Sequence, residues 1–218
     1  MRLTLPAICV ITRARGTSGS AERLRLLERL SSAAEAGATM IQIRERQLDD
    51  RRLLEFTGEV LGAVSSHRCL VLVNDRTDVA IAARADGVHL KSDAPAGTDV
   101  RRIVPPGFVI GRSVHSLREA QNGIDTGGCD YLLFGTVFPS RSKPEGHPVA
   151  GTDALHQVCK NVQLPVLAIG GLNESRAAQV AAAGAAGIAA ISLFAEAGDI
   201  RATVSRLRDA LTRSDGSV

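Results

Sequence analysis

The chain of 218 residues has few aromatic side chains, with one Tyr, five Phe and no Trp. Proteins that bind single-stranded nucleic acid stack the bases on aromatic rings, so this scarcity argues against such a surface. Its formal charge of +3, from 26 Lys and Arg against 23 Asp and Glu, is too small to indicate a basic binding patch. We therefore expect no nucleic-acid partner.

Long apolar segments and paired cysteines are also missing. No stretch reaches the roughly 20 apolar residues that cross a bilayer, and a strand-like run begins at residue 7 without a signal-peptide pattern. The four cysteines lie far apart, with no Cys-x-x-Cys spacing, which favours free thiols over disulfides or a metal site. We expect a cytoplasmic protein without a membrane span.

What the sequence does contain is an alternation of short apolar runs with longer segments of helical period. The runs predict strands at residues 7–12, 40–44, 70–74, 87–90, 108–111, 131–134, 166–169 and 187–192. The intervening periodicity predicts helices at 21–36, 50–65, 78–84, 99–104, 117–126, 175–183 and 200–211. Apolar strands that alternate with helices indicate an α/β protein with a parallel sheet.

Eight such units in one chain of this length fit a single closed (β/α)₈ TIM barrel. We expect one domain over residues 1–218, with 213–218 as a frayed polar tail. The competing open, doubly wound sheet would need a Gly-x-Gly-x-x-Gly turn after the first strand, and residues 12–20 lack it. Association into a homo-oligomer stays open.

In a barrel, polar residues at the carboxyl ends of the strands gather at one mouth. Gln42, Arg44 and Arg46 share one face of the second strand, because side chains alternate along a strand. Two guanidinium groups facing inward need an anion, which is either a ligand or a carboxylate of the protein itself.

Asp75 and Asp93 follow consecutive predicted strands, so both belong to the same mouth. Carboxylates beside a basic cluster suit a magnesium ion that bridges to a substrate phosphate. The alternative for Asp75 is a helix N-cap.

Glycines and serines near the last three strands suggest phosphate binding. Gly170, Gly171 and Ser192 fall where barrels often hold a phosphate, although the glycines also fit a tight turn. The loop 136–151, which contains Ser140, Ser142 and Lys143, is long enough to form a mobile cover.

Two histidines lie near the mouth. His115 follows the fifth strand, as an acid–base group or as a residue bonded to a local carbonyl. His89 lies within a strand and is expected to be internal and satisfied.

These residues carry a resemblance to the thiamine phosphate synthase family, which includes the thiazole tautomerases. The matching motifs, in order, are residues 41–46, 73–76, 85–90, 110–116, 134–143, 168–171 and 191–192. The resemblance implies a TIM barrel and a reaction that joins a hydroxymethylpyrimidine diphosphate to a thiazole phosphate or its carboxylate. The diphosphate departs first, and the thiazole nitrogen captures the resulting carbocation. The products are thiamine phosphate and pyrophosphate.

The resemblance also implies roles for individual residues. It places Gln42 at the pyrimidine, Arg44, Arg46, Asn74, Ser113 and Lys143 at the diphosphate, Asp75 and Asp93 at Mg²⁺, Ser140 and Ser142 near the thiazole, and Gly171, Ile191 and Ser192 at its phosphate.

Departures from the family pattern keep two alternatives open. Lys91-Ser92 replaces the usual Gly-Gln, Ala94 replaces a second acidic residue, and Arg46 replaces Lys. The first alternative is a thiazole tautomerase that uses His115 as acid and base and needs no magnesium. The second is a degenerate binding or regulatory protein of thiamine biosynthesis.

Overall fold

The computed structural model describes residues 3–13, 16–140, 144 and 146–212. Eight parallel strands close into a barrel in the order of the sequence, with β1 beside β8. The strands are β1 Ala7–Ile11, β2 Met40–Ile43, β3 Leu70–Asn74, β4 Gly87–Leu90, β5 Val109–Val114, β6 Tyr131–Gly135, β7 Val166–Ile169 and β8 Gly187–Ala190. The expected (β/α)₈ barrel is confirmed.

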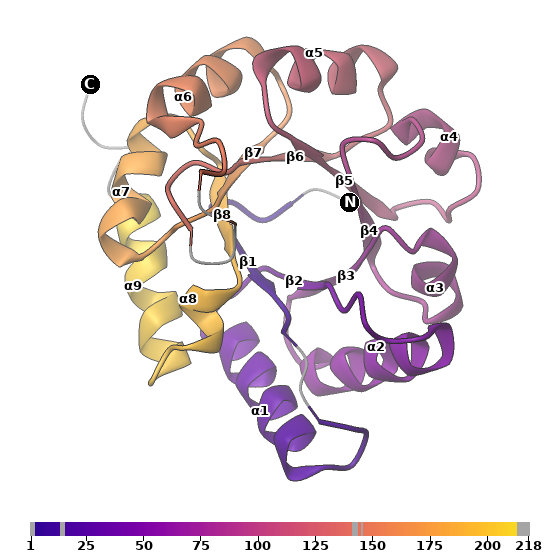
Figure 1. Cartoon of the computed structure of the whole chain (residues 1–218). Helices are drawn as coiled ribbons and strands as arrows, with labels where there is room; N and C mark the ends of the chain where they lie inside the picture. The colour runs from indigo at the N-terminus through magenta and orange to yellow at the C-terminus, as the bar shows by residue number, and fades with distance from the viewer. Residues whose placement is uncertain (1–2, 14–15, 141–143, 145, 213–218) are drawn as a thin grey trace.

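Helices surround the barrel on its outside (Figure 1). They are α1 Ala21–Glu35, α2 Asp50–Val64, α3 Thr77–Ala82, α4 Gly97–Arg101, α5 Leu117–Thr126, α6 Gly151–Asn161, α7 Glu174–Ala182, α8 Ser192–Ala195 and α9 Ile200–Thr212. Several begin at a side chain that satisfies a free amide of the first turn. Asp49 accepts from the amide of Arg52 at 2.9 Å, and Asn173 accepts from that of Arg176 at 2.9 Å.

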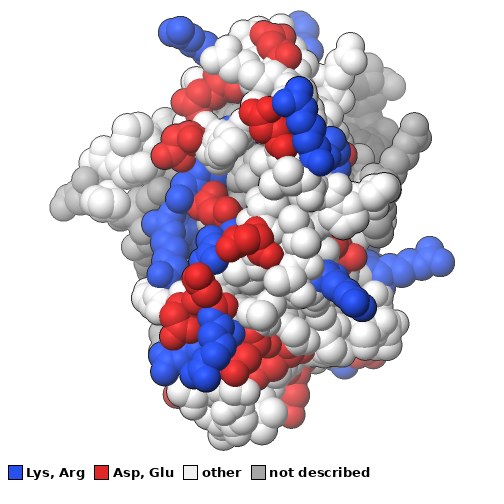
Figure 2. Space-filling model, turned by 90° about the vertical axis from the view of Figure 1, so that its right-hand side faces the viewer, with Lys and Arg blue, Asp and Glu red and all other residues white. Residues whose placement is uncertain are grey.

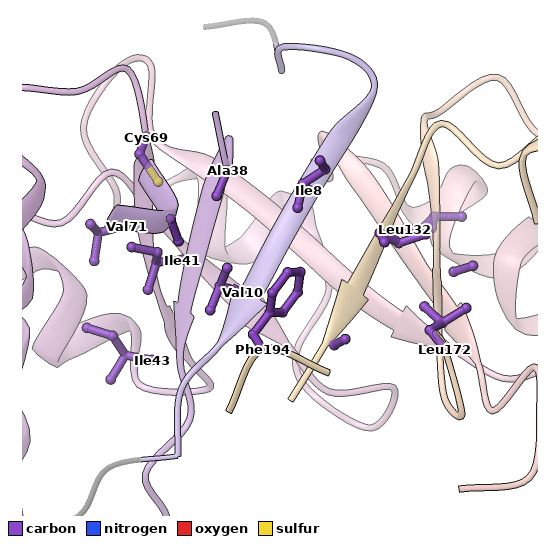
Figure 3. Packing of buried hydrophobic residues seen from close by; sticks show 14 of the residues in the cluster. Ile8, Val10, Ala38, Ile41, Ile43, Cys69, Val71, Leu132, Leu172 and Phe194 are labelled. Atoms are coloured by element: carbon purple, nitrogen blue, oxygen red, sulfur yellow. The ribbon is translucent and has the colours of Figure 1, made fainter. Parts of the chain in front are cut away.

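The core has two layers, because alternate side chains of each strand point inward and outward. Ile8 and Val10 of β1 pack outward against the helices, and Figure 3 shows them in one cluster with Ile41 and Phe194. Cys9 of the same strand belongs to the separate inner cluster. Both faces of the sheet are therefore buried, as the apolar strands predicted.

The structure departs from the expected elements most clearly in three places. The fifth strand continues to Val114, so Ser113 lies within it, whereas the polar Arg112-Ser113 pair had suggested an earlier end. The eighth strand stops at Ala190, and Ser192 begins the short α8. The helix α6 was not expected, and it buries Leu155 and Val158 against the barrel.

The structure also bears on the expectations for the cysteines, for membrane spans and for surface charge. All four cysteines are free thiols, as expected. Within the described ranges, no helix is long and apolar enough to cross a membrane. On the face seen in Figure 2, acidic and basic side chains are interspersed.

Candidate active site

A cavity of about 530 Å³ opens at the carboxyl ends of the strands. Its wall includes most of the residues that the sequence singled out, namely Gln42, Arg44, Arg46, Asn74, Asp93, Ser113, His115, Ser140, Gly170, Gly171, Ile191 and Ser192. These residues come from seven different strand ends or loops, so the closed barrel brings them together. Lys143 and Ser142 lie outside the described residues, and Asp75 is not part of the wall.

A chain of hydrogen bonds fixes the orientation of Gln42. The Asp75 carboxylate accepts from the amide nitrogen of Asn74 at 3.0 Å, and the Asn74 oxygen accepts from Gln42 Nε2 at 2.8 Å. Because a carboxylate only accepts, the direction of the whole chain is set. Gln42 Oε1 is left as a buried acceptor with no partner among the described residues, on a side chain that is 2 % exposed.

The same wall has an excess of positive charge. Neither Arg44 nor Arg46 forms an ion pair with an acidic side chain of the described residues. Burial and then the neighbouring Arg46 lower the pKa of Arg44, although a guanidinium remains charged. The internal ion pair considered for these arginines is therefore absent from this part of the structure, which favours an anionic ligand.

Asp75 is held by the residue that follows β4. Its carboxylate accepts from the Lys91 backbone amide at 2.9 Å and pairs with Lys91 Nζ at 2.8 Å. The N-cap position of α3 is Arg76, and no side chain caps that helix. The N-cap alternative for Asp75 is thus wrong, because its oxygens face Lys91 and Asn74 instead of the helix.

The loop between β4 and α4 is organised by Arg112 of β5. The buried guanidinium donates to the backbone carbonyls of Lys91, Ser92 and Ala94 at 3.1–3.3 Å, and to that of Pro95. One side chain thereby shapes the loop that presents Lys91 and Asp93 to the cavity. Asp93 is exposed there.

The far side of the cavity offers backbone groups to a ligand. Gly170 and Gly171 have φ values of 104° and 61°, so the turn they form is one that favours glycine. Both also line the cavity, and phosphate binding at this turn stays a prediction. The opening amides of α8, at Ser192, have no acceptor within that helix.

Two histidines belong to the region. His115 Nδ1 bonds the Gly135 carbonyl at 2.5 Å, so Nδ1 carries the proton and Nε2 is the acceptor in the neutral ring. His115 also lines the cavity. The bond to a local carbonyl and a place at the cavity wall are therefore compatible for this residue. His89 is internal and satisfied, as expected, with Tyr131 Oη at 2.9 Å and Ser113 Oγ at 2.8 Å.

Sequence reasoning missed three residues of this arrangement. Lys91 was noted only as a departure from a motif, Arg112 as part of a polar strand end, and Tyr131 as a strand residue. Only the register of the barrel shows that these side chains support the cavity.

The fold is a TIM barrel, and its cavity is lined by more basic than acidic side chains. The sequence profile of the thiamine monophosphate synthase family matches residues 8–194. The chain belongs to this family.

Named relatives agree with this placement. A thiamine-phosphate synthase from Methanoculleus marisnigri is 44 % identical over 178 residues, covering 81 % of this chain and 83 % of the relative. One from Methanocella arvoryzae is 41 % identical over 181 residues, covering 82 % and 84 %. The solved thiamine phosphate pyrophosphorylase from Pyrococcus furiosus superposes with a TM-score of 0.81 at 34 % identity, covering 96 % and 97 %. The resemblance and the transferase class inferred from the sequence are confirmed.

Proposed function

We propose that the chain joins a hydroxymethylpyrimidine diphosphate to a thiazole phosphate and releases pyrophosphate. The bond between the pyrimidine methylene carbon and the diphosphate oxygen breaks, and its electron pair leaves with the pyrophosphate. The lone pair of the thiazole nitrogen then forms the new carbon–nitrogen bond. The main task of the protein is to stabilise the charge that develops on the leaving group.

The observation that carries this proposal is the buried Gln42 Oε1, which has no partner among the described residues, beside Arg44 and Arg46, which form no ion pair with those residues. A buried acceptor without a partner is costly, so the site is suited to a ligand with a donor at that point. An aminopyrimidine supplies such a donor, and its diphosphate supplies the anion for Arg44 and Arg46.

The diphosphate would lie along the β2 to β5 side of the cavity, where Asn74, Ser113 and Lys91 add donors to the two arginines. The thiazole phosphate would lie opposite, at Gly171, Ile191 and Ser192, with Ser140 between them. Lys143 and Ser142 keep their proposed roles at the diphosphate and the thiazole as predictions from sequence.

Magnesium also remains a proposal. Among the described residues no three His, Cys, Asp or Glu side chains gather around one point. Mg²⁺ commonly uses only one or two carboxylates together with substrate phosphates, so Asp75 and Asp93 fit as its donors. The Asp75 oxygens already accept from Lys91 and Asn74, so the ion would take the place of the Lys91 ammonium. When bound, it would neutralise charge on the diphosphate.

The test is pyrophosphate release from the purified protein supplied with both substrates, in Mg²⁺ and then in EDTA. We expect release together with thiamine phosphate in Mg²⁺ and a large loss in EDTA. Folded protein that forms no thiamine phosphate would refute the proposal, and equal rates in EDTA would refute the role of the metal.

Gln42→Met provides a sharper test, because it keeps the length of the side chain and removes the acceptor. We expect the KM for the pyrimidine diphosphate to rise by about tenfold or more. Binding of the thiazole phosphate should stay unchanged. Gln157→Met on exposed α6 is the matched control. An unchanged KM for Gln42→Met would contradict the role of Gln42.

One observation favours the tautomerase alternative. The unprotonated Nε2 of His115 gives the cavity wall a base, as a proton shift on a thiazole carboxylate phosphate requires. His115→Asn should abolish such a shift and lower the rate of the coupling reaction only slightly. Native protein that shifts the proton but forms no thiamine phosphate would make the tautomerase the better assignment.

A further inference from the structure

We propose that Tyr131 and His89 are positioning residues that leave the Ser113 hydroxyl hydrogen free to donate toward the cavity. The Tyr131 hydroxyl donates to His89 Nδ1, and His89 Nε2–H donates to Ser113 Oγ. The Ser113 hydroxyl hydrogen is then left for an anionic oxygen of the ligand. The identity of that ligand as a diphosphate rests on the proposed function, whereas the direction of the bonds does not.

The three side chains come from neighbouring strands of the barrel. His89 lies in β4, Ser113 in β5 and Tyr131 in β6. The distances are 2.9 Å from Tyr131 Oη to His89 Nδ1 and 2.8 Å from His89 Nε2 to Ser113 Oγ. Tyr131 and His89 are each 1 % exposed, while Ser113 is half-buried and lines the cavity.

The direction of the bonds follows from the buried tyrosine. Among the described residues, its hydroxyl has no partner other than His89 Nδ1. If Nδ1 carried the proton, the Tyr131 oxygen would have to accept, and its own hydrogen would be buried without an acceptor. Buried donors are nearly always satisfied, so Tyr131 donates and Nδ1 accepts.

A neutral imidazole has one N–H, so the remaining proton of His89 lies on Nε2. This N–H donates to Ser113 Oγ and prevents the hydroxyl from donating back to the ring. An imidazolium would donate from both nitrogens and would again leave the buried Tyr131 hydrogen without an acceptor, so the same contacts favour the neutral ring.

The consequence for recognition is that the His89 ring does not compete for the Ser113 hydrogen, and among the described residues no other acceptor bonds it. A hydroxyl whose hydrogen is free, and whose oxygen already accepts from His89, suits a phosphate oxygen better than a ligand that presents an N–H or O–H at the same point. Tyr131, which does not line the cavity, would thus influence ligand choice through two intervening groups.

The first experiment is ¹⁵N NMR of histidine-labelled protein without ligand. The chain has only five histidines, and comparison with the His89→Gln spectrum assigns the signal of interest. We expect the Nε2–H tautomer for His89, unchanged between about pH 5.5 and 8. An Nδ1–H tautomer or an imidazolium in this range would overturn the proposal. Absence of synthase activity would not affect this result, so the two proposals fail separately.

The second experiment is a double-mutant cycle with Tyr131→Phe and Ser113→Ala, measured as the calorimetric affinity for inorganic pyrophosphate. Phe keeps the ring and removes only the hydroxyl. We expect Tyr131→Phe to weaken pyrophosphate binding by about tenfold when Ser113 is present. In the Ser113→Ala background it should have no further effect. Additive losses would show that Tyr131 acts on the fold and not through Ser113.

Discussion

At the scale of single residues, one carboxylate sets the orientation of two amide side chains in the cavity wall. Asp75 can only accept, so Asn74 turns its nitrogen toward it and its oxygen toward Gln42. The unpaired Gln42 oxygen is therefore a consequence of a charge two side chains away. Replacing Asp75 would release the orientation of both amides, in addition to removing the carboxylate that we propose for magnesium.

Lys91 places a positive charge beside the Asp75 carboxylate in this site. Its ammonium lies 2.8 Å from Asp75 Oδ2, at the carboxylate that we propose for magnesium. The side chain is 52 % exposed, so it is free to move toward an incoming diphosphate. The Asp75 side chain is 19 % exposed, so solvent screens this pair mainly on the Lys91 side, and it is the ammonium that can change partners there.

We expect Lys91→Met to tighten binding of Mn²⁺, used as a probe for magnesium, by about tenfold in the absence of substrate. The reason is that the cation no longer competes with the ammonium for Asp75. Electron paramagnetic resonance measures the free Mn²⁺. Lys160→Met on α6 removes the same charge from an exposed site and should have little effect. Equal affinity in the native protein and the Lys91 variant would mean that Asp75 does not hold the ion.

At the scale of elements, the β4–α4 loop depends on a side chain from the next strand. Arg112 donates to the backbone carbonyls of four residues of that loop. Its planar guanidinium reaches all four, which a single ammonium does not. The geometry of Lys91 and Asp93 is thus fixed from β5.

Arg112→Lys should loosen this loop while leaving the barrel folded. We expect a loss of about 2 kcal/mol in the free energy of unfolding, because the loop carbonyls lose their hydrogen bonds to a buried guanidinium. Hydrogen exchange of residues 91–95 should accelerate more than exchange in the strands. Arg118→Lys, on the exposed face of α5, is the control. Unchanged exchange in the loop would show that its own backbone bonds hold it.

Element boundaries also show what the sequence could and could not predict. Apolar strands such as 70–74 were recovered at both ends, because a buried strand bounded by polar residues has a clear pattern. β5 was cut short because Arg112 and Ser113 are polar, and inward-facing strand positions at a barrel mouth need not be apolar. The cavity residues were predictable from their positions at strand ends, whereas the Lys91–Asp75 pair and the Tyr131–His89 contact depend on side-chain geometry across strands.

At the scale of the whole molecule, the site exists only because the barrel closes. Residues from β2 to β5 face those from β7 and β8 across one cavity, and β1 pairs with β8 to complete the ring. The backbones of β1 and β8 approach each other closely where the ring closes. Gly187 lies opposite Ala7, and a Cβ at Gly187 would meet the Ala7 carbonyl oxygen at 2.1 Å.

Gly187→Ala should therefore destabilise the whole barrel, because the obstructing atoms are backbone and cannot rotate away. Overpacking of this kind typically costs about 1–3 kcal/mol, and we expect at least this loss in the free energy of unfolding by urea. Gly58→Ala is the matched control, since a Cβ there, in the middle of α2, meets nothing within 4 Å. Ala is the better helix former by about 1 kcal/mol, so this variant should gain stability. If both variants behaved alike, the seam between β1 and β8 would be able to widen without loss, and barrel closure would not limit the stability of the fold.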